Sequence, residues 1–495
     1  MTLEKKLNKM KVLYFAAECK PFSKVGGVGD VAGELPIELK RQGIDIEVIT
    51  PLYGIVKKEL IGKKAKEYFI DFNGKKEKIE IYETELANLK VNLMKNETYF
   101  EGGYSEPYIY SHNTPLYDDS LRFSFFSEAS LELIKEKNPD IVHINDWVLG
   151  YLPGFMELEG MNQKKVLTIH NAGYQGNIWK EVVRRWNIKK IMDNERLNNL
   201  FTDPHLEWNN INPLKLGIEL SDMVNTVSPN YCNEIIMPEN QETYFEGGRG
   251  LENISKRKYD EGKLIGILNG YNYTFEPADE KFEKCIKEKK LIKKYLSYEF
   301  CNSNDFIIGF VGRAVEQKLK LLMEQINGKS VLEYILDIPD INVAVLATGE
   351  PHYESFLKSF IERKNYSATI KFDKEKARQI SLGSDIFLMP SLYEPCGITQ
   401  MESMSNATPP LVRWTGGLVD TVRDYRLNNG TGFGFDGTSR DNLLSSLIIT
   451  AISAFFFHKN DKESFRKIQY NGFKKRFLWE DTAKEYIKKV YEPLL

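Results

Sequence analysis

The sequence predicts an α/β protein made of two doubly wound halves, each built around a parallel sheet. The chain has 495 residues, and a single hydrophobic core rarely grows beyond about 250–300 residues, so two domains are expected. Short apolar runs alternate with segments of helical periodicity, which is typical of parallel strands joined by crossover helices. The alternation stops at a turn-rich stretch, 269–277, and then starts again.

In the first half, a strand at 12–17 leads through a glycine-rich turn into a helix over 28–39, which ends near Gly43. A second strand follows at 44–50. The other strands expected in this half are 141–144, 166–169, 223–227 and 264–268.

The second half repeats the pattern. Its expected strands are 306–311, 343–346, 369–372, 386–389 and 411–412. Open α/β sheets bind ligands beyond the carboxyl ends of their strands. We therefore expect the functional site where these ends of the two halves face each other across an interdomain cleft.

The composition is that of an ordinary soluble protein, with 42% hydrophobic and 28% charged residues. The 67 Lys and Arg nearly balance the 70 Asp and Glu, giving a net charge of -3. This balance argues against a nucleic-acid partner or a membrane surface recognised by bulk charge.

Neither a signal peptide nor a membrane-spanning helix is expected from the sequence. The N-terminal apolar run is too short for a signal peptide, and no run reaches the roughly 18 apolar residues that span a bilayer. The closest run, 447–457, is interrupted by Thr450 and Ser453 and has the length of a buried helix. We expect a cytoplasmic protein, or a plastid one if a transit peptide has been removed, without a membrane partner.

Two glycine-rich loops follow strands and open helices, one in each half: Lys24 to Asp30 and Thr415 to Asp420. Glycine lets the backbone approach a ligand closely, and the free N–H groups of a helix N-terminus attract phosphate. Neither loop has the spacing of a dinucleotide fingerprint or a P-loop, so a tight strand-to-helix turn explains each loop alone equally well. Their presence on both halves favours phosphate binding.

Charged residues also follow two strands of the second half. Arg313 and Lys318 come after the strand at 306–311, where two cations can converge on a diphosphate and balance the charge that develops as it leaves. Glu394 follows the strand at 386–389, where a carboxylate can bind sugar hydroxyls, and Gly397 opens a helix. The alternatives are solvated loop cations and a helix-capping turn.

Two histidines of the first half, His143 and His170, end or nearly end strands. Neither has H-x-x-x-H spacing or a cysteine cluster nearby, so a metal site is not expected. A lone histidine at a strand end is ordinarily a core or supporting hydrogen-bonder.

The five cysteines are widely spaced and include no C-x-x-C pair, which argues against a disulfide framework and favours a reducing cytosol. They are Cys19, Cys232, Cys285, Cys301 and Cys396.

The string ETYFEGG occurs twice, at 97–103 and at 242–248. No period of 20–50 residues accompanies it, so it is not an architectural repeat. We interpret it as a chance similarity between two loops.

Taken in order, the motifs resemble those of the bacterial and plastidial glycogen and starch synthases, which are retaining glucosyltransferases of the two-domain GT-B architecture. The most specific strings are Glu394-Pro-Cys-Gly and Thr415-Gly-Gly-Leu-x-Asp-Thr-Val. Supporting strings begin at Lys24, His143, His170, Thr226, Leu268 and Arg313, so the match covers nearly the whole chain.

The resemblance implies two Rossmann-like domains facing an interdomain cleft. The acceptor-side domain would span 1–273 and be joined by a C-terminal helix at 479–495 that crosses back onto it. The nucleotide-sugar-binding domain would span 274–478.

The resemblance also implies the substrates: ADP-glucose as donor, with UDP-glucose as the alternative, and the non-reducing end of an α-1,4-glucan such as glycogen, starch or a maltooligosaccharide as acceptor. Lys24, Arg313 and Lys318 would hold the donor diphosphate, assisted by backbone N–H groups of the two glycine-rich loops. Phe372, at a strand end, would stack on the base.

The site residues that the resemblance implies form three groups. The catalytic group is His170, Arg313, Lys318 and Glu394. The donor-binding group is Lys24, Gly26, Gly27, Asn269, Phe372, Cys396, Gly397, Thr415, Gly416 and Gly417. The acceptor-side group is Asp30, Tyr104 and Asp146.

The expected chemistry needs no nucleophile from the protein. A diphosphate leaves readily once cations balance its charge, and the acceptor hydroxyl can attack from the face of the leaving oxygen, which can take the proton. We therefore expect no metal, no pyridoxal phosphate and no other cofactor.

Four places depart from the family pattern: Val148-Leu149-Gly150, Asn272, Leu392 and Ser405-Asn406. They bear on acceptor fit and hinge geometry rather than on the residues nearest the chemistry. One alternative is a catalytically silent glucan-binding or regulatory homologue, which would tolerate loss of the cations that this chain keeps. Another is a glucan phosphorylase, which would need lysine-bound pyridoxal phosphate and usually a longer chain.

Overall fold

The computed structural model describes residues 10–102, 109–110, 117–205, 209–300 and 306–495, and the chain divides into two compact units. Unit 1 comprises Met1–Pro238, Gly247–Gly270 and Leu478–Leu495, and unit 2 comprises Glu239–Glu246 and Tyr271–Phe477. The sequence did not lead us to expect that the short segment Glu239–Glu246 belongs with unit 2.

Unit 1 is built on a sheet with the strand order β11-β10-β7-β6-β1-β2-β5-β4-β3. All six strands expected from apolar runs are present, and with β5 they form a parallel sheet. The bounds are β1 Lys11–Phe15, β2 Asp45–Pro51, β5 Leu89–Lys95, β6 Ile141–Asn145, β7 Lys164–Ile169, β10 Met223–Thr226 and β11 Leu264–Gly266.

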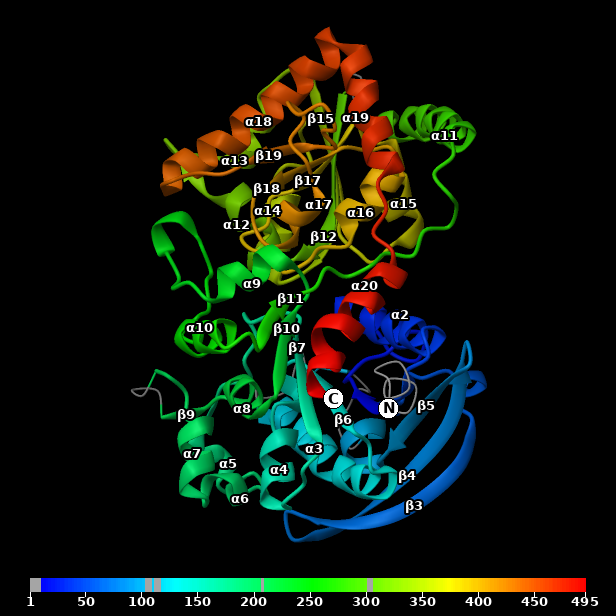
Figure 1. The fold of residues 1–495 in the computed structure, drawn as a ribbon. Helices are drawn as coiled ribbons and strands as arrows, with labels where there is room; N and C mark the ends of the chain where they lie inside the picture. Colours follow the sequence, from blue (N-terminus) through cyan, green and yellow to red (C-terminus); the bar gives the residue numbers. More distant parts are fainter. Residues whose placement is uncertain (1–9, 103–108, 111–116, 206–208, 301–305) are drawn as a thin grey trace. The chain divides into compact units, whose positions relative to one another are not determined.

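The edge of this sheet is an antiparallel hairpin of β3 (Lys63–Phe72) and β4 (Lys75–Leu86), which Figure 1 shows as two long curved strands. The sequence analysis did not include it. These strands carry many charged residues, and at most every second side chain along them is buried. This pattern suits an edge of a sheet that faces water. A search for apolar runs misses strands of this kind.

The helices of unit 1 cover the sheet and fill the connections. The main ones are α2 Gly27–Arg41, α3 Tyr117–Lys137, α4 Leu152–Leu158, α8 Pro213–Leu220, α9 Pro229–Ile235 and α10 Glu252–Asp260. Three shorter helices are α5 Lys180–Val183, α6 Lys189–Met192 and α7 Glu195–Phe201. They accompany a two-stranded pair, β8 Ile178–Trp179 and β9 Asn210–Ile211. Helix α2 begins one residue before the expected start and buries Val31, Ala32, Leu35 and Leu39, as its spacing predicts.

The C-terminal segment packs within unit 1. It begins as α20 (Trp479–Tyr486) beside α2 and continues through a π turn at Ile487–Tyr491 and a 3-10 turn at Glu492–Leu494, so it is not the single helix expected over 479–495. Tyr486 and Tyr491 are fully buried in the core of unit 1.

Unit 2 is built on a fully parallel sheet with the order β16-β15-β12-β17-β18-β19. The bounds are β12 Phe306–Ala314, β15 Ile341–Gly349, β16 Tyr366–Thr369, β17 Ile386–Met389, β18 Pro410–Arg413 and β19 Phe433–Phe435. The expected strand at 369–372 was wrong: β16 ends at Thr369, because the Asp373 side chain accepts a hydrogen bond from the Lys376 N–H and starts the next helix.

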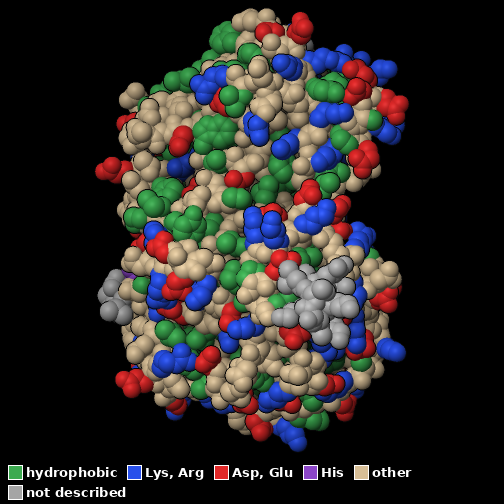
Figure 2. Space-filling view, viewed as in Figure 1, with side chains coloured by type: hydrophobic (Ala, Val, Ile, Leu, Met, Phe, Trp, Pro, Cys, Tyr) green, Lys and Arg blue, Asp and Glu red, His purple; other side chains and the backbone are tan. Residues whose placement is uncertain are grey.

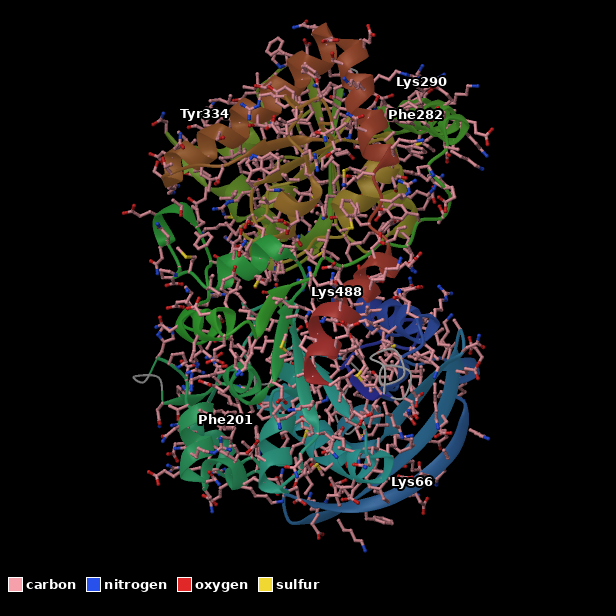
Figure 3. The ribbon with its side chains drawn as sticks, viewed as in Figure 1. Lys66, Phe201, Phe282, Lys290, Tyr334 and Lys488 are labelled. Carbon is pink, nitrogen blue, oxygen red and sulfur yellow. The ribbon has the colours of Figure 1, made fainter. Side chains whose placement is uncertain are left out.

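Helices surround this second sheet. They are α11 Asp279–Ser297, α12 Glu316–Met323, α13 Val331–Leu336, α14 Pro351–Lys358, α15 Lys374–Gly383, α16 Thr399–Ser405, α17 Gly417–Thr421, α18 Arg440–Asn460 and α19 Lys462–Lys474, and a small hairpin pairs β13 Gln325–Ile326 with β14 Lys329–Ser330. On α11 (Figure 3), Phe282 is buried against the rings of Tyr470 and Phe473, whereas Lys290 is exposed. Apolar periodicity therefore fixes which face of α11 meets α19.

Within the described ranges, α18 is the one helix long and apolar enough to cross a membrane by length and composition. Six of its side chains, among them Leu447, Ala451 and Phe455, are buried in the core of unit 2. Ile449 and Phe456 are exposed, so the buried helix expected at 447–457 is buried on one face only. Figure 2 shows basic and acidic side chains interspersed over the visible face, in agreement with the balanced net charge.

Candidate active site

The carboxyl ends of β12 and β17 bring a cation and a carboxylate together in unit 2. Lys318, in the first turn of α12, forms an ion pair with Glu394 of the loop after β17. The Ser391 hydroxyl donates to Glu394 Oε2 at 3.0 Å and lies 3.3 Å from Lys318 Nζ. Glu394 is only 8% exposed, so its charge is balanced by one ammonium group in a mostly dry environment.

The same loop is locked to α12 by backbone contacts. The Gln317 side chain donates to Tyr393 O at 2.8 Å, and Leu392 N donates to Gln317 O at 2.8 Å. Both bonds are made by Gln317, the residue directly before Lys318 in the sequence. The position of Glu394 is therefore set by the fold before any ligand binds.

The glycines after β18 serve close packing. Gly417 N donates to Glu394 O at 2.9 Å, and a side chain at Gly416 or Gly417 would collide with the backbone oxygen of Glu394 or Cys396. Gly416 also has a φ of 48°, which favours glycine. The Gly417 amide thus donates to the Glu394 loop in this structure, and phosphate binding by the backbone amides around Gly416 and Gly417 stays a prediction.

Cys396 and Gly397 form the turn that leads into α16. The Gln400 amide donates to Cys396 O at 3.1 Å and Gly397 O at 3.0 Å, and Gly397 has a φ of 72°. The helix begins at Thr399, two residues later than the sequence suggested. Thr415 is buried beside this turn, near Gly416.

Two other predicted residues of unit 2 lie on a strand or beyond one. Arg313 is on β12 itself, opposite Thr348, because the strand continues to Ala314 and leaves no loop there. Its side chain is exposed. Phe372 is 78% exposed and lies three residues beyond the end of β16, so it is not at a strand end.

In unit 1, His170 follows β7 and is held by Asn145 at the end of β6. Asn145 Nδ2 donates to Phe15 O, so its Oδ1 accepts from the Tyr14 hydroxyl at 3.0 Å and from His170 Nε2 at 2.8 Å. The proton of His170 is therefore on Nε2, and Nδ1 has no hydrogen-bond partner within the described part of the chain. Burial lowers the pKa of His170 to about 3, so the ring is neutral near pH 7.

His143 has the supporting role expected of a lone strand-end histidine. It is fully buried on β6, with Nδ1 2.8 Å from the Tyr491 hydroxyl and Nε2 2.7 Å from Thr168 Oγ1. Burial lowers its pKa to about 3. It ties the central strands of unit 1 to the C-terminal segment.

Asp146 lies directly after β6 in a left-handed conformation, with a φ of 57°. Its Oδ1 accepts from His170 N at 2.7 Å and from Asn171 N at 3.4 Å. Burial raises the pKa of Asp146 to about 7; the two backbone amides oppose this rise, and the nearby Glu18 carboxylate contributes to it. The carboxyl group thus orders the loop that carries His170 and titrates near neutrality.

Glu18 is a site residue that the sequence analysis missed. It is 1% exposed, and its Oε2 accepts from Val25 N at 2.6 Å and Gly26 N at 3.0 Å, while Tyr110 donates to Oε1 at 3.2 Å. Burial raises its pKa. The available signal was a carboxylate placed directly after the apolar run of β1.

This contact engages one amide of the first glycine-rich loop. The Gly26 amide donates to Glu18, while Gly27 begins α2, and phosphate binding by this loop stays a prediction. Lys24 Nζ lies 2.5 Å from Asp30 Oδ2, in the first turn of α2, and both side chains are partly exposed. The predicted diphosphate ligand and the predicted acceptor residue therefore form an ion pair.

Asn269 follows β11 and is 4% exposed. Its Oδ1 is buried without a hydrogen-bond partner in the part of the chain that the structure describes. A buried polar atom of this kind is costly unless a ligand or water satisfies it. Tyr104, predicted on the acceptor side, lies outside the described residues.

Two doubly wound units, each built around parallel strands, are the architecture of the GT-B class of glycosyltransferases. Solved structures agree: the catalytic domain of starch synthase IV from Arabidopsis thaliana, bound to ADP and acarbose, matches over 98% of this chain and 99% of its own, with a TM-score of 0.78 and 27% identity. A sucrose-phosphate synthase from Thermosynechococcus elongatus shares the fold, with a TM-score of 0.56 and 15% identity over 98% of this chain and 99% of its own.

Sequence comparison identifies the family. A starch synthase catalytic domain matches residues 11–257, and a group 1 glycosyl transferase domain matches 297–465. Glycogen synthases of Thermotoga petrophila and Clostridioides difficile are each 35% identical over 97% of this chain and 98% of their own length. The chain belongs to the glycogen and starch synthase family of glycosyltransferases.

Proposed function

We propose that this protein transfers glucose from ADP-glucose to the non-reducing end of an α-1,4-glucan, with retention of configuration. The observation that carries the proposal is the buried Lys318–Glu394–Ser391 cluster in unit 2. The cluster holds a cation and a carboxylate side by side in a fixed geometry. A sugar diphosphate offers phosphate oxygens to the cation and sugar hydroxyls to the carboxylate.

The ammonium of Lys318 has three N–H donors. Glu394 and Ser391 engage two of them, which leaves one for an oxygen of the leaving phosphate. Glu394 oxygens accept hydrogen bonds from glucose hydroxyls, and the exposed guanidinium of Arg313 adds a second cation for the diphosphate. Because phosphate charge grows as the glycosidic bond breaks, these cations act most strongly in the transition state.

Unit 1 supplies the groups for the sugar and the acceptor. The neutral His170 offers Nδ1 as an acceptor for a sugar hydroxyl, since its proton is on Nε2. Asn269 Oδ1 is a second buried acceptor, and Asp146 and Asp30 carry carboxyl groups for the glucan. No metal, pyridoxal phosphate or other cofactor is required in this proposal.

The reaction balances without a protein nucleophile. The bond between glucose C1 and the phosphate oxygen breaks, and the acceptor hydroxyl oxygen bonds to C1 from the same face. The hydroxyl proton passes to the departing phosphate oxygen. The products are the nucleoside diphosphate and a glucan longer by one residue.

Relatives support the choice of substrates. The relatives named above are glycogen synthases, and the related starch synthase IV was solved bound to ADP and acarbose, a nucleoside diphosphate and an oligosaccharide mimic. By family analogy, ADP-glucose is the donor here, and a soluble intracellular location follows from these substrates.

The experiment is a parallel transfer of radiolabelled glucose to glycogen from ADP-glucose and from UDP-glucose. We expect transfer mainly from ADP-glucose, and a product that an α-1,4-specific exo-amylase degrades fully. Lys318→Ala should lower turnover by about 10²-fold or more, whereas the matched control Lys320→Ala, on the same helix but paired with Glu324, should keep it. Glucan binding without transfer from either donor would instead identify a silent homologue.

A further inference from the structure

Helices α16 and α17 lie beside each other in unit 2 (Figure 1), and each follows one of the two loops of this unit that are predicted to bind the donor. The Glu394 loop leads into α16, and the glycine-rich loop after β18 leads into α17. Both loops have to meet one sugar diphosphate, so their spacing has to be fixed. The side chain of Gln400, in the first turn of α16, is fully buried and contacts both segments.

The side-chain amide of Gln400 faces three oxygen atoms. Its Nε2 lies 3.1 Å from Cys396 O and 3.0 Å from Gly397 O, in the turn that follows Glu394. It also lies 3.1 Å from the hydroxyl oxygen of Thr421, on α17. Two N–H groups are shared among three acceptors, which fixes the orientation of the amide.

Thr421 closes a circuit of hydrogen bonds. Its hydroxyl donates to Gly417 O at 2.6 Å, so its oxygen accepts from Gln400. Gly417 N in turn donates to Glu394 O at 2.9 Å. The path therefore returns to the loop from which it started, and the Glu394 loop is joined to α17 at two points.

The glycines in these segments leave no slack between them. A β carbon at Gly417 would lie 2.3 Å from Cys396 O, and one at Gly397 would lie 2.5 Å from Gln400 Oε1. The two segments are thus in direct contact, and a shift of one of them displaces the other.

Gln400 also carries a cost. Its Oε1 is buried without a hydrogen-bond partner in the described ranges of the chain. An unpaired buried acceptor lowers stability, whereas a methionine of similar shape would fill the space without that acceptor. Methionine cannot donate to the three oxygens, so the N–H groups rather than the packing explain why a glutamine suits this position.

We propose that Gln400 is a positioning residue for the sugar donor, which fixes the spacing between the Glu394 loop and the glycine-rich loop before α17. The inference rests on the proposed function, because Glu394 is assigned there to the glucose hydroxyls. Gln400 is fully buried, so it acts through the backbone that it holds. Its loss should weaken donor binding and spare the acceptor, since the groups assigned to the glucan belong to unit 1.

The test compares Gln400→Met with the matched control Gln469→Met in the full chain. Gln469 makes a similar contact beyond the other end of α16, where its Nε2 donates to Ala407 O at 2.9 Å. We expect Gln400→Met to raise the KM for ADP-glucose by about 10-fold or more and to leave the KM for glycogen unchanged, because only the donor loops are displaced. Gln469→Met should keep both KM values.

Thr421 provides a second variant in case Gln400→Met fails to fold. Thr421→Val keeps the shape of the side chain but removes the hydroxyl, so it should raise the same KM, and Thr421→Ser should bring it back toward the parent value. A merely structural role would lower the turnover number by loss of folded protein and leave both KM values unchanged. That result, or an equal rise of the donor KM in Gln469→Met, would overturn the proposal.

Hydrogen exchange tests the circuit without activity. In Gln400→Met, backbone amides should exchange faster both in residues 394–400 and in residues 415–421, and a change in only one of the two segments would also overturn the proposal. A parent that transfers glucose from neither donor would refute the proposed function, while the exchange result would still decide whether Gln400 joins the two segments.

Discussion

Asp146 combines backbone strain with a carboxyl group whose pKa is raised. A left-handed conformation costs an ordinary residue about 1–3 kcal/mol, and it persists only where the surroundings hold it. Here the carboxyl group accepts two amides of the His170 loop, and its pKa is raised to about 7 by burial. Stability is thus given up at a position that orders the site.

The pH dependence of stability follows from this pKa. The unfolded carboxyl titrates near pH 4 and the folded one near pH 7, so the folded protein holds a proton in between, and stability from this group is lost as the pH rises through that range. At about 1.4 kcal/mol per pH unit, the loss is at most about 4 kcal/mol.

We expect Asp146→Asn to unfold at higher urea concentration than the parent at pH 8, and to gain little at pH 4, because Asn still accepts the two amides but does not ionise. Urea titrations at both pH values measure this. Transfer activity should fall in the same variant, since the acceptor-side carboxyl group is lost. A stability gain of equal size at both pH values would show that the charge is not the cause.

The Lys318–Glu394 pair should be strongly coupled. Removing one partner leaves a mostly buried charge unpaired, so Lys318→Met should lower the free energy of unfolding by about 1–3 kcal/mol. Glu394→Gln removes the need for the cation, so the double variant should be destabilised by less than the sum of the single changes. A double-mutant cycle in urea measures the coupling, and strict additivity would contradict the ion pair.

The departures from the family pattern are accommodated locally. Val148 and Leu149 are buried in the core of unit 1. Asn406 caps the C-terminus of α16 and donates to Ser381 Oγ at 2.9 Å. Leu392 packs against the core of unit 2. Asn272 is exposed. The Lys318–Glu394 cluster is intact beside these departures.

At the scale of elements, the loop before α17 should tolerate no side chain. Gly416→Ala would collide with the backbone of Glu394, so we expect a loss of transfer activity of about 10²-fold and a lower melting temperature. Gly328→Ala is the matched control, because Gly328 also has a positive φ, of 80°, but has nothing within 4 Å. Backbone strain alone should lower the stability of Gly328→Ala by about 1 kcal/mol, and this variant should keep its activity. If both variants lost activity equally, backbone strain rather than the steric clash would be the cause.

The two ETYFEGG strings show how little a short string determines. The described part of the first copy forms a π turn at Glu97–Gly102, in which Tyr99 is buried and stacks on Phe125 with ring centroids 4.3 Å apart. In the second copy, Tyr244 adopts a left-handed backbone on unit 2. Packing partners decide the conformation of both copies, which agrees with the interpretation of a chance similarity.

At the scale of the whole molecule, the C-terminal segment completes the core of unit 1. Asn225 Nδ2 donates to the Tyr486 hydroxyl, so Asn225 Oδ1 accepts from the Thr168 hydroxyl. The Thr168 oxygen in turn accepts from His143 Nε2. His143 Nδ1 therefore accepts from the Tyr491 hydroxyl. This buried chain of hydrogen bonds joins three strands to the last residues of the protein.

Tyr491→Phe should leave His143 Nδ1 unsatisfied and destabilise unit 1 by about 1–3 kcal/mol. Hydrogen exchange under mild denaturant should show earlier opening of unit 1, with unit 2 unchanged. Tyr298→Phe, at a 70% exposed position of unit 2, is the control and should behave as the parent. Equal opening of both units in Tyr491→Phe would mean that they unfold as one.

The sequence alone determined the class of fold, the order of the buried strands and the positions of Lys318, Glu394 and His170, because apolar runs and strand-end motifs are local in the chain. It did not reveal the charged edge hairpin, the end of β16, the buried Glu18 or the assignment of Glu239–Glu246 to unit 2. The tertiary structure decided these features, since each depends on which distant groups share a desolvated environment. The amides of Gly26 and Gly417 make the point: a glycine-rich loop suggests phosphate binding, but packing directs both amides to Glu18 and Glu394.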